Sequence, residues 1–176
     1  MFIKNTIAYK EINKIDMGLT WLTIEKSIKK ETDWLKSNIF PFHSDKNPLN
    51  LPDDTFYRLI AILIVSGQVK TTEYFYDSSK IIGFNSVHSP NKEHGTEWHN
   101  NLINYLHDYF EKQGFEVYTS EPMLYYGQAD LKVISEKVIY FEIDTVGIFK
   151  LWVNLKNMKN INIIILTSNK IIKFEL

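Results

Sequence analysis

The amino-acid sequence predicts an α/β fold, in which a mixed β-sheet flanked by helices follows a smaller α+β part. Three observations favour this class. Helical and strand patterns alternate along the second half of the chain, and one near-continuous apolar run is typical of a buried strand. A helical segment lies between that run and the strand before it. A helix that connects two neighbouring strands implies a mixed sheet with helices packed on it.

The composition excludes several classes of protein. The chain has 176 residues, of which 44% are hydrophobic and 14% aromatic, so it can form a packed core. Its formal net charge is −1 and Arg58 is its only arginine, which disfavours base readout but leaves phosphate contacts by lysine open. It has no cysteine for disulfides or thiol chemistry. The longest apolar run, Leu59–Val65, is too short to span a membrane, and we expect a cytoplasmic protein.

Residues 1–88 predict a small helical domain with a hairpin. The predicted elements are a short strand at Phe2–Tyr9, a helix over Thr20–Ile39, a helix from Asp53 or Asp54 to Val65, and strands at Val69–Tyr76 and Lys80–Phe84. Helices followed by a hairpin are similar to a winged-helix domain, whose wing tip would be Asp77–Lys80. The lysines of the first helix form either a solvated face or a phosphate-binding face.

Residues 89–176 predict the main sheet, after a linker at residues 85–92. The predicted order is helix, strand, hairpin, helix and two strands, at Thr96–Gln113, Phe115–Ser120, the hairpin of residues 128–144, Ile148–Met158, Ile161–Thr167 and Ile171–Phe174. The helix between the hairpin and the next strand is the predicted crossover connection.

The predicted hairpin carries three acidic residues. Side chains alternate along a strand, so Glu142 and Asp144 project to one side. A three-residue loop at Ser135–Lys137 would place Asp130 opposite Glu142, whereas a two-residue turn would shift the register and separate them. Close carboxylates need a cation between them, and oxygen ligands suit Mg²⁺ or Mn²⁺ rather than zinc. The alternative is that these acids occupy the solvent face of a half-exposed hairpin.

The same residues resemble the PD-(D/E)xK (restriction-endonuclease-like) nuclease superfamily, which has an acid on one strand and acid-x-lysine on the next. Here Asp144 stands in the position of the lysine. From Glu93 onward the chain is also similar to small archaeal, plasmid and viral proteins of that superfamily, whose N-terminal part is winged-helix-like. The matching pieces are Gly95-Thr96-Glu97, Ala129-Asp130 and Glu142-Ile143-Asp144-Thr145, with the final glycine of the motif displaced to Gly147.

The resemblance implies that Asp130, Glu142 and Asp144 bind Mg²⁺ or Mn²⁺, or that Asp144 orients the attacking water. By motif, Glu97 matches an acid of the first helix that often completes this site. Its helical phase points it away from the apolar face, unless the first turn is irregular, as Gly95 permits.

Two basic groups are further candidates. The missing lysine of the motif could come from the crossover helix, as Lys150 or Lys156, and the alternative is that both are solvated surface lysines. His99 falls on the apolar face of its helix, where we expect a core histidine rather than a metal ligand.

The resemblance implies a Mg²⁺-dependent DNA endonuclease, a phosphodiester hydrolase that acts as a homodimer, with Phe149 and Trp152 offering apolar surface for the dimer. The lost lysine, the displaced glycine and the phase of Glu97 favour an alternative, a catalytically inactive DNA-binding protein or regulator with the nuclease fold. If the carboxylates repel one another, replacing Asp130 or Glu142 with its amide should hold or raise stability.

Overall fold

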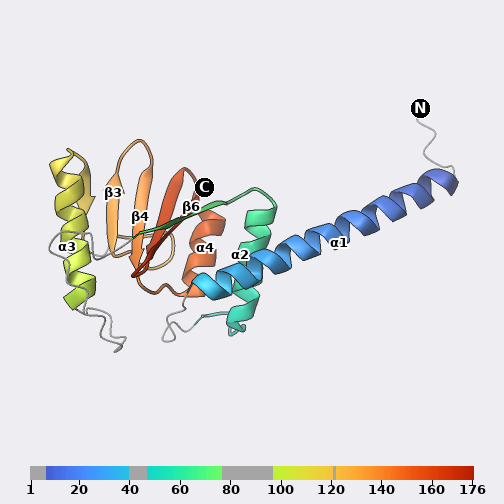
Figure 1. The fold of residues 1–176 in the computed structure, drawn as a ribbon, viewed down its shortest axis with the longest axis horizontal. Coiled ribbons are helices and arrows are strands. Elements are labelled where there is room, and N and C mark those ends of the chain that lie inside the picture. The colour runs from blue at the N-terminus through green and yellow to red at the C-terminus, as the bar shows by residue number, and fades with distance from the viewer. Residues whose placement is uncertain (1–6, 40–46, 77–96, 121) are drawn as a thin grey trace.

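The computed structural model describes residues 7–39, 47–76, 97–120 and 122–176. In these residues the chain is an α/β protein with one six-stranded mixed sheet and four helices (Figure 1). The predicted class, a mixed sheet flanked by helices, is confirmed at this level.

The sheet has the spatial order β1-β6-β5-β4-β3-β2. Its strands are β1 (Lys70–Phe75), β2 (Glu116–Tyr118), β3 (Leu131–Ile134), β4 (Val138–Ile143), β5 (Ile161–Leu166) and β6 (Lys170–Glu175). Only β4 and β5 run parallel, and α4 (Ile148–Asn157) connects them; the other neighbouring pairs are antiparallel. The crossover predicted between the hairpin and the apolar strand is therefore present.

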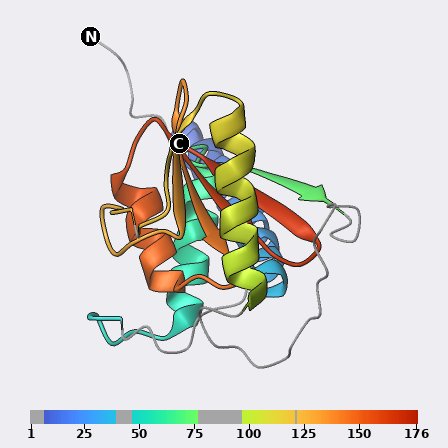
Figure 2. The same ribbon diagram turned by 90° about the vertical axis from the view of Figure 1, so that its left-hand side faces the viewer.

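Helices cover the sheet on both faces (Figures 1 and 2). One apolar cluster joins α3 (Glu97–Lys112) to the odd-numbered side chains of the central hairpin, such as Leu131 and Phe141. A second cluster joins α4, α2 (Asp53–Val65) and the end of α1 (Ile7–Asn38) to β5 and β6. Neighbouring residues of one strand face opposite sides, so each face of the sheet packs against a different set of helices.

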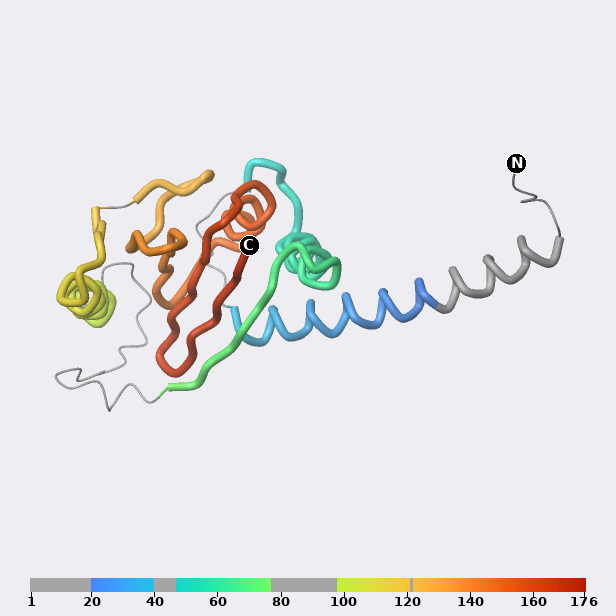
Figure 3. Tube along the Cα trace, turned by 90° about the horizontal axis from the view of Figure 1, so that it is seen from above, coloured from blue at the N-terminus to red at the C-terminus, as the bar shows by residue number. Residues whose placement is uncertain are grey.

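The first helix extends far beyond the sheet (Figure 3). Ile28 and Leu35 of α1 are buried, whereas Trp21 is 60% exposed and Leu22 58%. The strand predicted at Phe2–Tyr9 is wrong for residues 7–9, which belong to α1. Once the packed part of α1 has formed, each further residue adds a hydrogen bond at little cost, so the helix continues through a weak strand pattern.

The parts predicted as two domains share one sheet and one core. Strand β1 pairs along its length with β6, and Phe56 of α2 packs against Phe149 and Trp152 of α4, with ring centroids 5.1 and 5.5 Å apart. Phe149 is buried and Trp152 half-buried in this contact, so neither offers the open dimer surface that was expected. The predicted boundary at residues 88 and 89, the linker, the wing tip and the strand at Lys80–Phe84 lie outside the described residues.

Helix α2 begins at Asp53 and ends at Val65, as predicted. Its N-cap is Pro52, without a side-chain cap, and Asp53 and Asp54 lie in the first helical turn. Carboxylates there stabilise the helix through its dipole rather than by capping. Among the helices of the described segments, none has the length and apolar character needed to cross a membrane.

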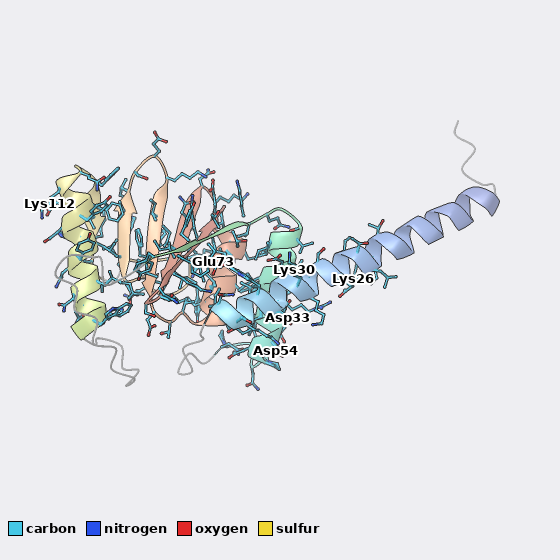
Figure 4. The ribbon with its side chains drawn as sticks, viewed as in Figure 1. Lys26, Lys30, Asp33, Asp54, Glu73 and Lys112 are labelled. Carbon is cyan, nitrogen blue, oxygen red and sulfur yellow. The ribbon has the colours of Figure 1, made fainter. Side chains whose placement is uncertain are left out.

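In the part of α1 whose side chains the structure describes, the lysines are exposed, as Lys26 and Lys30 illustrate (Figure 4). Two others pair with acids: Lys29 with Asp33 at 2.6 Å and Lys36 with Asp54 at 2.8 Å. These contacts agree with a solvated helix face. The only arginine, Arg58 of α2, is also engaged, because both Glu25 carboxylate oxygens lie 2.9 Å from its Nη2.

Candidate functional site

The central hairpin has the register that the three-residue loop predicts. Leu131 pairs with Phe141 and Ile134 with Val138, which leaves Ser135–Lys137 as the loop. The side-chain hydroxyl of Ser135 donates to the carbonyl of Lys137 at 2.6 Å and stabilises this turn. Asp130 lies just beyond the paired residues, where its own N–H donates to the carbonyl of Phe141 at 3.0 Å.

Glu142 forms a buried ion pair with Lys150. The Glu142 side chain is 5% exposed and its two oxygens lie 2.8 and 2.9 Å from Lys150 Nζ. Lys150 comes from the first turn of α4 and also donates to the carbonyl of Gln128. With 17% of its side chain exposed, Lys150 is not the solvated lysine of the alternative interpretation. Lys156, in contrast, is exposed at the end of α4.

Asp130 is held by a backbone group and a histidine. Its Oδ2 accepts a hydrogen bond of 2.7 Å from the N–H of Ile143, and its Oδ1 lies 3.3 Å from His99 Nε2. Hydrogen bonding to Asp130 raises the pKa of His99, although burial of the ring acts in the opposite direction. His99 is thus a mostly buried histidine, as expected, and its partner is a candidate site residue.

Asp144 ends β4 and begins the turn into α4. Its φ is +70°, in the left-handed region, and its N–H donates to the carbonyl of Leu166 at 2.6 Å. Aspartate tolerates this conformation better than long or branched side chains do. The backbone conformation therefore gives a physical reason for an aspartate where the nuclease motif has lysine. Asp144 also lies close enough to His99 to favour its protonation.

In this structure Asp130, Glu142 and Asp144 do not form a group of three whose ligand atoms all lie within 4.8 Å of one another. In the described part of the chain, only His107, Asp108 and Glu111 of α3 form a group of three with ligand atoms within 4.8 Å of one another. The register is as predicted, but Asp130 turns toward His99 of α3, whereas Glu142 turns toward Lys150 of α4. The two helices pack against opposite faces of the sheet, so Asp130 and Glu142 are held by contacts from different helices. Glu97 is the first residue of α3, and its side chain is not among those described.

A polar clamp fastens the segment before β3 to α4. Asn154 is 1% exposed, and its side chain accepts from the N–H of Tyr126 at 2.8 Å and donates to the carbonyl of the same residue at 2.9 Å. At Gly127, where φ is +77°, an added Cβ would lie 3.4 Å from the Lys150 stem. The sequence signal for this clamp is an asparagine four residues after Lys150 on the crossover helix, where the two side chains share a face.

Comparison with known proteins gives no match: no protein-family model, no curated protein and no solved structure is similar to this chain at a significant level. Only the residues and the geometry of the site therefore indicate what the protein does.

The site places two carboxylate–base pairs, Glu142 with Lys150 and Asp130 with His99, on the two strands of the hairpin. Carboxylate oxygens can bind a hard divalent cation, and a lysine or a protonated histidine can bind a phosphate oxygen. Because the sole arginine is engaged elsewhere, lysine and histidine supply the positive charge here. This arrangement is suited to phosphoryl chemistry more than to thiol, hydride or acyl chemistry.

Proposed function

We propose that the chain is a divalent-metal-dependent DNA endonuclease of the PD-(D/E)xK type, which hydrolyses phosphodiester bonds. The observation that carries this proposal is the ion pair between Glu142 at the end of β4 and Lys150 of α4. It puts a lysine beside the motif glutamate although the strand position of the motif lysine holds Asp144. The order α3-β2-β3-β4-α4-β5, with an antiparallel meander and a parallel crossover, supports the same proposal.

The donor set fits a hard cation in chemistry. Asp130, Glu142 and Asp144 offer only oxygen ligands, which suits Mg²⁺ or Mn²⁺. Such an ion, when bound, lowers the pKa of a water molecule and stabilises charge on the scissile phosphate. Lys150 neutralises Glu142 and can contact a phosphate oxygen, the role of the motif lysine. His99 keeps Asp130 in place and can hold a proton at Nε2.

A second function is supported by a different observation. Two of the three carboxylates already have a partner without any added ion: Lys150 for Glu142, and the Ile143 N–H with His99 for Asp130. Such a site can be stable without a metal, which favours a catalytically inactive DNA-binding protein or regulator.

A homodimer is part of the nuclease proposal, since cutting both strands of a duplex with one site per chain needs two copies.

The deciding experiment incubates the protein with plasmid, linear and branched DNA, with and without Mg²⁺ or Mn²⁺. We expect cleavage that needs the ion and is lost in both Asp130→Asn and Glu142→Gln. Asp108→Asn, which alters the exposed acidic group of α3, is the matched control and should retain cleavage. If the wild-type protein binds DNA, cuts none of these substrates and gains no thermal stability from Mn²⁺, the inactive binding protein is the better account.

A further inference from the structure

A row of three side chains crosses the sheet next to the candidate site. Tyr118 of β2 pairs with Lys132 of β3, and Lys132 pairs with Tyr140 of β4, so the three project from the same face. The ammonium of Lys132 lies 5.2 Å from the centre of the Tyr118 ring and 5.9 Å from that of Tyr140. Tyr140 precedes Glu142 by two residues, so the row also faces the same side as Glu142.

This row borders a cavity of about 370 Å³, whose lining includes Tyr118, Pro122, Met123 and Lys132. Its size is at the lower end of the range for sites that enclose a small molecule. Tyr118 is 45% exposed, and Glu116 accepts a hydrogen bond from its hydroxyl and so fixes the ring at the sheet edge. The cavity therefore combines an open aromatic face, a thioether and an ammonium group.

The segment on the other side of the cavity is exposed and firmly held. Residues 122–128, here called the aromatic loop, expose Met123 and Tyr125, the latter by 66%. The Asn154 clamp fixes the backbone of the loop at Tyr126, and Lys150 binds its carbonyl at Gln128. Large apolar groups on a fixed loop lose little conformational entropy when a ligand binds to them.

We propose that Tyr118, Lys132 and the aromatic loop bind unpaired nucleotides of single-stranded DNA, an inference that rests on the proposed nuclease function and names its substrate class. Bases stack on open aromatic rings whatever their sequence, and an ammonium group beside them binds the backbone phosphate. Lys132 is two residues beyond Asp130, about 7 Å along the strand, close to the spacing of consecutive phosphates in an extended strand. The cavity therefore lies on the face of the sheet that carries Glu142, the motif glutamate of the proposed site. The only arginine of the chain is already engaged in an ion pair, so no arginine is free to read the edges of the bases. Binding by stacking alone therefore has no sequence preference.

The test measures binding of three fluorescein-labelled probes by anisotropy in EDTA: an oligo-dT strand, the same strand with abasic residues, and a blunt duplex of equal length. Wild-type protein should bind oligo-dT about ten-fold tighter than the abasic strand, which has the same charge. Tyr118→Ala should weaken oligo-dT binding by about five-fold or more and leave abasic binding unchanged. Tyr118→Phe keeps the ring and should retain tight binding. Lys132→Met should weaken binding of both strands and reduce its dependence on salt.

Tyr109→Ala is the matched control, because Tyr109 is an equally exposed tyrosine on α3, which packs against the other face of the sheet. Equal affinity of wild-type protein for oligo-dT and the abasic strand would overturn the proposal, and so would equal effects of Tyr118→Ala and Tyr109→Ala. A change in molecular mass by light scattering in Tyr118→Ala, with unaltered DNA binding, would assign the surface to a second copy of the chain. Failure of the nuclease proposal alone would give a different result. Cleavage would be absent, but the wild-type protein and Glu142→Gln would both still bind oligo-dT more tightly than the abasic strand.

Discussion

Replacing Lys150 with methionine tests the feature on which the proposed site depends. Methionine keeps most of the stem that packs beside Gly127 but removes the ammonium group, so Glu142 stays charged in a site where it is 5% exposed. Removing one partner of a buried ion pair costs about 3–5 kcal/mol. Lys150 itself is only 17% exposed, so solvent screening reduces this cost little.

The measurement is reversible unfolding by heat and by urea. For a protein of this size, a loss of 1 kcal/mol lowers Tm by about 2–4 °C, so Lys150→Met should lower Tm by about 6–20 °C at pH 8. The same experiment bears on function, since the variant should lose cleavage at temperatures where it is still folded.

Two further variants make the result decisive. Lys156→Met is the same substitution on the exposed end of α4 and should change stability by no more than about 0.5 kcal/mol. The double variant Glu142→Gln with Lys150→Met leaves no buried charge and should recover most of the stability lost in Lys150→Met. If Lys150→Met and Lys156→Met are equally mild, or if the double variant recovers nothing, the inferred ion pair does not hold the site together.

Further predictions concern the clamp, the histidine, the strand end and Glu142. Asn154→Ala should cost about 2–4 kcal/mol, because it removes both hydrogen bonds between the buried Asn154 side chain and the Tyr126 backbone; faster amide exchange at Tyr126 would confirm it, with Asn157→Ala as the exposed control. NMR titration should give His99 a pKa above 6.5, and Asp130→Asn should lower that pKa. Because the pKa of His99 is higher in the folded state, the stability that this pair contributes is present below pH 6.5 and is lost as pH rises through the folded-state pKa. Asp144→Gly should fold normally, whereas Asp144→Lys should lose about 1 kcal/mol in thermal denaturation from strain at φ +70°; equal Tm values would contradict the strain. Glu142→Gln should lower Tm, against the sequence-based expectation, because the pair with Lys150 outweighs any relief of repulsion.

Local periodicity predicted most of the second half of the chain. The helix at Ile148–Met158, the apolar strand at Ile161–Thr167 and the three-residue hairpin loop match α4, β5 and the observed register. These features depend on short-range patterns: a 3.6-residue or two-residue repeat and the length of a turn. The glycines that follow α2 and α3 adopt the left-handed conformation typical of helix ends, with φ of +75° at Gly67 and +83° at Gly114.

Long-range partners could not be predicted in the same way. Strand β1 was expected to belong to a separate N-terminal hairpin, but it pairs with β6 about a hundred residues later in the chain. Alternation within β1 shows that one face packs against something, and it does not identify the partner. The length of α1 also escaped prediction, because the helix continues beyond the residues whose burial sets its pattern.

The site shows the same division between local and long-range information. The position after β4 must take a left-handed conformation for the chain to turn into α4, and aspartate meets that need at Asp144 where lysine would be strained. A lysine from the first turn of α4 reaches back to Glu142 and Gln128, so the strand end keeps its turn and the glutamate still has a cation. A search for the motif with its lysine on the strand would conclude that this chain lacks the catalytic lysine. The contacts of Lys150 instead point to a site in which the charge is supplied from the adjoining helix, and the loss of cleavage in Lys150→Met, with retention in Lys156→Met, is the result that this account requires.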